Sequence, residues 1–171
     1  MNEEILGLDD ESNDYGLIYL ISNEEQVLNI NKNFVTISTM LDNLIKGDNT
    51  AGLLDNKIKL SKVNTRCLEY IITYMKHHKG IDKDMPTQPL KSVDMHEVMN
   101  DSWDADFINS LIPEYNDNES PDLKLLVDMI LSANYLHMTH LLHKLCAKIA
   151  SLIRGKDEDE IPNILQSINN D

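Results

Sequence analysis

The sequence predicts an α+β fold in which a small unit of strands and helices precedes a further group of helices. Residues 15–80 contain two short apolar runs around a polar turn, a third short alternating run, and two stretches with helical spacing. From residue 123 onward, apolar residues recur near three- and four-residue steps, as on one face of a helix. The length of 171 residues suits one domain with an appendage and a substantial core.

The first strands are expected at residues 17–21 and 27–30, joined by the polar turn at 22–25. Asn33 is expected to cap a helix that Gly47 ends. The apolar residues of this helix are Val35, Ile37, Met40, Leu41 and Leu44.

Residues 46–56 are expected to form a loop, and the alternation at 57–60 predicts a short half-buried strand. Asn64 opens a second helix, which Gly80 ends. Its helical apolar residues are Cys67, Leu68, Ile71, Ile72 and Met75.

Residues 81–102 contain Pro86, Pro89 and scattered polar residues, which favours a flexible linker. Order is expected to resume at Trp103, and residues 113–122 form an acidic loop.

The run ILSANYLHMTHLL at residues 130–142 predicts two helices with a tight joint. The first apolar stripe comprises Leu123, Val127, Ile130 and Leu131, and the second comprises Leu141, Leu142, Leu145, Ile149, Leu152 and Ile153. A last helix is expected from Asp157, because acidic residues favour the amino end of a helix. Its apolar residues are Ile161, Ile164, Leu165 and Ile168.

The formal net charge of -14 disfavours binding to nucleic acid or an anionic membrane, and favours a basic protein partner. Cys67 and Cys146 lie on apolar helical stripes without a neighbouring thiol, so both are expected to be reduced core residues of an intracellular protein. The acidic residues 1–14 are expected to be disordered and lack the pattern of a secretory signal. No window reaches the length of apolar sequence that spans a bilayer.

In order along the chain, several short strings resemble the Skp1 family. They are VTISTML at 35–41, IKLSKV at 58–63, YMKHH at 74–78, Trp103-Asp104 with Phe107, residues 130–136, IRGK at 153–156 and INND at 168–171. The resemblance implies a BTB/POZ fold followed by Skp1-type carboxy-terminal helices. It divides the chain into a disordered amino terminus (1–14), the first part of the BTB/POZ domain (15–80), a linker (81–102), the remainder of that domain (103–142) and carboxy-terminal helices (143–171).

The same resemblance implies an adaptor that links F-box proteins to a cullin in an SCF-type ubiquitin ligase, without catalytic activity or cofactor, in the cytoplasm and nucleus. Asn134 and Tyr135 match the cullin-facing positions of the family. The residues expected to bind the F-box are Val127, Ile130, Leu142, Cys146, Ile149, Ile153, Ile161, Ile164 and Leu165.

The chain departs from the family pattern at three places. It stops at Asp171, where the family continues into an acidic, Trp-containing helix, so a trimmed or shortened relative is expected. Residues 112–122 replace a shorter family segment. Residues 157–160 lack the proline that is modified in some relatives. The helices at 143–171 favour Skp1 over the related adaptor elongin C.

Other interpretations remain open. From composition alone, residues 133–136 fit an ordinary helix end with Tyr135 half-buried, and the apolar stripes fit an internal core. The alternative function is a self-associating BTB/POZ scaffold, with a weak homodimer of the unpartnered chain, or a partner of F-box proteins outside the ligase, as in a kinetochore complex.

Metal binding and catalysis find little support in the sequence. His137, His140 and His143 share a three-residue spacing, but no carboxylate or cysteine completes a ligand set. His77 and His78 are adjacent, about 100° apart on a helix, and are expected on the surface. The chain has no Gly-rich phosphate loop and no nucleophile motif, and its many carboxylates are expected to be solvated.

Overall fold

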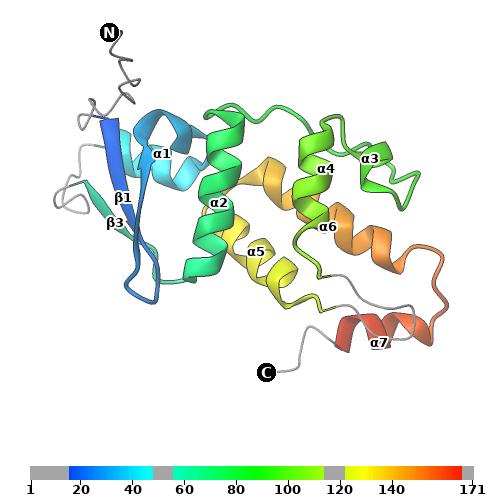
Figure 1. Cartoon of the computed structure of the whole chain (residues 1–171). Coiled ribbons are helices and arrows are strands. Elements are labelled where there is room, and N and C mark those ends of the chain that lie inside the picture. Colours follow the sequence, from blue (N-terminus) through cyan, green and yellow to red (C-terminus); the bar gives the residue numbers. More distant parts are fainter. Residues whose placement is uncertain (1–15, 48–55, 114–121, 167–171) are drawn as a thin grey trace, which may run out of the picture.

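The computed structural model describes residues 16–47, 56–113 and 122–166. A small sheet lies at one end of the molecule, α2 crosses the middle, and α3, α4 and α6 form the other end (Figure 1). The expected disordered residues 1–14 and most of the loops expected at 46–56 and 113–122 lie outside the described residues.

The sheet contains the expected strands. Strands β1 (Leu17–Ile21) and β2 (Val27–Asn31) pair antiparallel, and β1 also pairs parallel with β3 (Lys57–Lys59). The strand order is therefore β2-β1-β3. Ile18, Leu20, Ile30 and Ile58 are buried, so alternate residues of the strands face the core.

The expectation of a single helix from Asn33 to Gly47 is wrong, because the chain forms two helices there. A 3-10 helix, η2 (Lys32–Ile37), is capped by Asn31, and α1 (Thr39–Lys46) is capped by Ser38. Ser38 is extended, and its Oγ accepts a hydrogen bond from the Leu41 amide. The same hydroxyl donates to Leu136 O at 2.6 Å, and this long-range contact fixes the break between the helices.

Helix α2 (Thr65–His78) begins and ends where the sequence predicts. The Asn64 side chain accepts a hydrogen bond from the Cys67 amide, and Lys79 and Gly80 take left-handed conformations after the last turn. Its apolar residues pack against β2, η2 and α5, so the helix forms the centre of the core.

The segment 81–102, expected to be a flexible linker, has some ordered structure and some buried residues. The segment contains α3 (Met95–Val98), and Pro86, Met95, Val98 and Met99 are buried. Helix α4 (Ser102–Asn109) follows, capped by Asp101. Buried methionines in an otherwise polar segment anchor it to the rest of the molecule.

Two helices with a tight joint follow, as predicted: α5 (Lys124–Tyr135) and α6 (Thr139–Ile153). His137 takes a positive φ of 53° in the joint, which reverses the chain within three residues. Helix α7 (Glu160–Gln166) begins three residues later than expected and packs against α6 (Figure 1).

The core-facing side of α5 differs from the predicted stripe. Leu126, Met129 and Ala133 are fully buried, whereas Leu131 is 61% exposed. Cys67 is buried as expected, but the expectation that Cys146 is a core residue is wrong, because this free thiol is exposed. The periodicity therefore located both helices correctly and only partly identified which face is inside.

Candidate functional site

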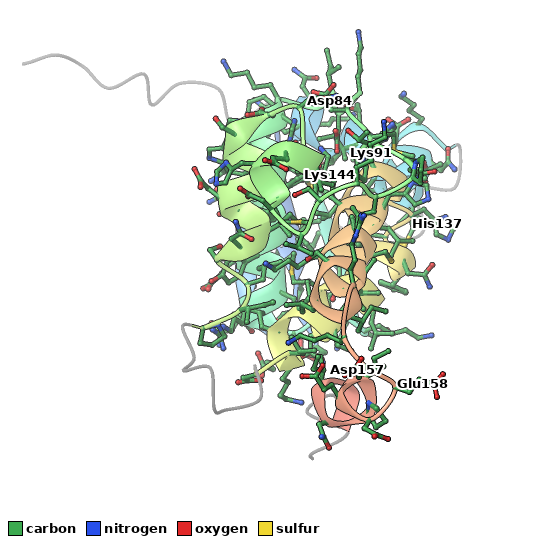
Figure 2. The ribbon with its side chains drawn as sticks, turned by 90° about the vertical axis from the view of Figure 1, so that its right-hand side faces the viewer. Asp84, Lys91, His137, Lys144, Asp157 and Glu158 are labelled. Atoms are coloured by element: carbon green, nitrogen blue, oxygen red, sulfur yellow. The ribbon has the colours of Figure 1, made fainter. Side chains whose placement is uncertain are left out.

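The joint between α5 and α6 presents the residues expected to bind a cullin. Asn134 is exposed. Tyr135 is half-buried and packs against the hydrophobic core. Lys62 Nζ lies 5.8 Å from the centre of the Tyr135 ring, a cation–π distance. His137 lies at the edge of the molecule in the view of Figure 2. An exposed amide beside a half-exposed aromatic ring suits recognition of a protein surface.

One side of α6 presents apolar residues that are not fully buried. Leu142, Ile149 and Ile153 are half-buried, and Cys146 is exposed. Their spacing of four, three and four residues places them on a single side of the helix. Val127 and Ile130 on α5, which packs against α6, are also half-buried. The structure therefore places six residues of the expected F-box surface on two neighbouring helices. These six residues are half-buried or exposed to solvent.

Helix α7 supplies the remaining residues of this surface. Ile161 and Ile164 are half-buried, and the side chain of Leu165 lies outside what the structure describes. The Asp157 amide donates to Glu160 Oε2 at 3.1 Å, so Glu160 closes the first turn as in a capping box. Asp157 and Glu158 lie beside α7 at the lower end of the molecule in Figure 2, away from His137.

A buried polar cluster was missed by the sequence analysis. Lys144 on α6 donates to Asp104 Oδ2 at 2.6 Å, to Asp82 Oδ1 at 3.0 Å and to Tyr74 OH at 2.9 Å. The side chains of Lys144, Asp82 and Asp104 are each 1% exposed. Tyr74 also donates to Asp82. The expectation that the carboxylates are solvated is therefore wrong for Asp82 and Asp104.

His78 completes this cluster, and so its expected place on the surface is wrong. Its side chain is 9% exposed, and Nε2 lies 2.8 Å from Asp104 Oδ1. His77 stacks on Trp103, with the ring centroids 3.7 Å apart, and so packs against α4 rather than standing free. The adjacent His77 and His78 therefore contact two successive residues of α4, Trp103 and Asp104 respectively.

The electrostatics of the cluster follow from its contacts. Burial raises the pKa of Asp104, but hydrogen bonds from His78 and Lys144 outweigh burial and hold this pKa below its ordinary value. Burial, reinforced by the neighbouring Asp82 carboxylate, raises the pKa of the Tyr74 hydroxyl. Asp104 is therefore ionised and Tyr74 is neutral at physiological pH.

One sequence signal could have revealed the cluster. Lys144 lies between Leu141 and Leu145, on the side of α6 that faces the core. A long charged side chain at such a position must find a partner of opposite charge, because burying it alone is strongly unfavourable. The sequence did not indicate which carboxylates would supply that partner, since they lie 40 and 62 residues away.

The cysteines show no sign of activation. Burial raises the pKa of the Cys67 thiol to about 11, and burial also raises the pKa of Cys146. Within the ranges 16–47, 56–113 and 122–166, no histidines, cysteines and carboxylates are grouped so as to hold a metal ion. None of the helices in these ranges is long and apolar enough to span a bilayer.

Comparison with known proteins agrees with this architecture. The model of the Skp1 family, tetramerisation domain, matches residues 16–80. The SCF ubiquitin ligase complex protein SKP1a of Dictyostelium discoideum is 31% identical over 155 residues, which cover 91% of this chain and 85% of that protein. The S-phase kinase-associated protein 1 homolog of Tetrahymena thermophila is 29% identical over 144 residues, covering 84% and 78%. The SCF subunit sconC of Arthroderma otae is 30% identical over 146 residues, also covering 84% and 78%.

The small three-stranded sheet, the helices around it and the helices that follow define an α+β protein with a POZ fold and carboxy-terminal extension. The relationship extends far beyond the matched POZ segment, through α5 and α6. The chain belongs to the Skp1 family.

Proposed function

We propose that the protein is an adaptor subunit of an SCF-type ubiquitin ligase, which holds an F-box protein and a cullin on separate surfaces and performs no chemistry itself. The observation that carries this proposal is the 31% identity to a Dictyostelium discoideum SCF ubiquitin ligase complex protein, over 85% of that protein's length. The cytoplasm and nucleus are the proposed compartments.

The F-box is proposed to bind the apolar side of α6 together with α5 and α7. Leu142, Ile149 and Ile153 are half-buried, and Cys146 is exposed beside them. An amphipathic helix could cover these residues by placing its own apolar side against them. Removing such residues from water favours association roughly in proportion to the apolar area that the partner covers.

The cullin is proposed to bind at the joint between α5 and α6. Asn134 and Tyr135 lie at the carboxyl end of α5, whereas the proposed F-box residues run from Leu142 toward α7. The two partners would therefore approach different ends of the same helical pair. A chain with a net charge of -14 favours a basic cullin surface.

Calorimetric titration tests the proposal directly. The whole chain is titrated separately with an F-box segment and with a cullin amino-terminal domain, and then with one partner in the presence of the other. Two saturable, independent binding events are expected. Absence of F-box binding, or competition between the two partners, would contradict an adaptor with separate surfaces.

A second function rests on one further comparison. The protein named Suppressor of kinetochore protein 1 in Schizosaccharomyces pombe is 25% identical over 149 residues, covering 84% of this chain and 81% of that protein. A role outside the ligase would use the F-box surface without the cullin surface. An Asn134 and Tyr135 variant that keeps full function in cells while losing cullin binding would favour this second role.

A further inference from the structure

We propose that Lys144 and Tyr74 are positioning residues that, through Asp82, hold residues 82–90 closed over one side of α6, where this segment forms the edge of the proposed F-box surface. Residues 82–90 are called the strap. The consequence for F-box binding rests on the proposed function, whereas the closed position of the strap is a property of the chain alone.

The strap is attached to α6 near both of its ends. At the first end, Asp82 Oδ1 accepts from Lys144 Nζ at 3.0 Å, with both side chains 1% exposed, and the same carboxylate accepts from Tyr74 OH. At the other end, the Arg154 guanidinium donates to Leu90 O. Asp84 and Lys91, near the two ends, are labelled beside Lys144 in Figure 2. The strap therefore runs along the helix from the turn of Lys144 to the carboxyl end.

Contacts between these ends hold the middle of the strap. Pro86 is buried, and the Thr87 amide donates to Val98 O at 3.0 Å. His143 Nδ1 lies 3.4 Å from Met85 Sδ. A pocket of about 230 Å³ remains between the strap and α6, lined by Pro86, Thr87, Gln88, Leu90, His143, Cys146, Ala147 and Ala150.

Helix geometry places the strap beside the proposed F-box residues. Successive residues of a helix are about 100° apart, so His143, Ala147 and Ala150 lie on the side next to the one that carries Leu142, Ile149 and Ile153. Cys146 lies between the two sides, is exposed, and lines the pocket. A helix that covers Leu142 and Ile149 would meet the strap at Cys146.

Lys144 contacts a second buried carboxylate besides that of Asp104, and this suggests a positioning role. Asp104 on α4 already pairs with it at 2.6 Å, while Asp82 brings a second negative charge into the same buried place. Breaking a buried ion pair leaves a buried charge without its partner, so such a pair favours the arrangement of the chain that keeps it formed. The arrangement fixed by Asp82 is that of the strap, since Asp82 is its first residue.

The test uses Asp82→Ala, because this variant frees the strap from both Lys144 and Tyr74 and leaves the pair between Lys144 and Asp104 intact. Asp84→Ala is the matched control, since Asp84 is an exposed carboxylate two residues further along. Site-resolved amide exchange is measured for Thr87 and for Tyr19, whose amide donates to Asn56 O beside the sheet.

In Asp82→Ala the Thr87 amide is expected to exchange at least about tenfold faster, while Tyr19 is unchanged, because only local opening becomes easier. Asp84→Ala should leave both amides unchanged. Equal Thr87 rates in the two variants would overturn the proposal. A uniform acceleration that includes Tyr19 would also overturn it, because the pair would then hold the whole fold and not the strap.

Titration with an F-box segment tests the consequence for binding. Asp82→Ala is expected to weaken F-box binding by about fivefold without changing cullin binding, since the edge of only one surface is loosened. Unchanged F-box affinity together with accelerated Thr87 exchange would show that the strap does not border the F-box surface. If the wild-type chain binds no F-box, the proposed function fails, and the amide exchange still decides whether Lys144 and Tyr74 hold the strap through Asp82.

Discussion

Lys144 Nζ lies 2.6 Å from Asp104 Oδ2, and both side chains are 1% exposed. This contact joins α6 to α4 in the interior of the molecule. Four of the residues proposed to bind an F-box project from another side of the same α6 helix: Leu142, Cys146, Ile149 and Ile153. The internal electrostatics and part of the proposed F-box surface therefore depend on one helix, and they can be tested separately.

Lys144→Met is expected to lower the free energy of unfolding by about 3–5 kcal/mol, because it leaves the carboxylates of Asp82 and Asp104 buried without their cation. Urea denaturation measures this loss. Lys76→Met, at an exposed position on α2, is the control and should change stability by less than about 0.5 kcal/mol. Equal midpoints for the two variants would contradict the buried ion pair.

Stability should also fall in acid because of Asp104. The pKa of this carboxyl is lowered in the folded state, whereas the unfolded chain keeps the ordinary value of about 3.9. The stabilisation from the Asp104 carboxylate is therefore fully present above about pH 4 and is lost as the pH falls through the lower, folded pKa.

Urea denaturation of Asp104→Asn should accordingly show lower stability at neutral pH but a shallower fall on acidification below about pH 4. Asp106→Asn is the control on the same helix, because the Asp106 side chain is 73% exposed. The Asp104 assignment is wrong if both variants show the same slope as the wild-type chain.

The cullin surface can be tested by changing Asn134 and Tyr135 to lysine together. The double variant is expected to weaken cullin binding by more than about 2 kcal/mol, since a half-exposed aromatic ring at an interface centre is a typical hot spot. F-box binding should be unchanged. Glu69→Lys on the exposed side of α2 alters the net charge by the same amount and controls for non-specific repulsion. Equal losses in the two variants would point to charge alone.

The F-box surface can be tested with Ile149→Asp. A carboxylate buried against an apolar partner helix lacks a counterion, so F-box binding should be abolished. Amide exchange in α7 is expected to be fast in the free chain, because short helices are marginal, and to slow when an F-box segment is added to the wild-type chain. In Ile149→Asp this slowing should be lost. Leu131→Asp, at a residue 61% exposed on α5, is the control. Loss of the sheet's protection in Ile149→Asp would instead show that Ile149 belongs to the core.

The sequence was sufficient to predict the elements whose causes are local. Strands β1 and β2 follow from two apolar runs around a turn, and α2 follows from Asn64, its apolar spacing and Gly80. The break at Ser38 was not predictable in this way, because it depends on a hydrogen bond to Leu136, 98 residues away.

The same distinction holds for the site. Asn134, Tyr135 and the apolar side of α6 came from family resemblance and helical spacing, and the structure places them on accessible parts of α5 and α6. Their roles in binding remain predictions. The segment 81–102 was expected to be a flexible linker because it contains prolines and many polar residues. In the structure, buried methionines and the ion pair between Asp82 and Lys144 attach this segment to the rest of the molecule. Such long-range pairing leaves little trace in local composition.

A bridging assay with complementary variants tests the adaptor claim most directly. A cullin amino-terminal domain is immobilised, and capture of a full F-box protein is measured with the wild-type chain, with the Asn134 and Tyr135 double variant, with Ile149→Asp, and with the two variants mixed. Only the wild-type chain is expected to bridge the partners, because both surfaces must belong to one molecule. If the mixture restores capture, one copy of the chain must bind the cullin while a second copy binds the F-box protein. This result would contradict a single-chain adaptor and favour a self-associating scaffold.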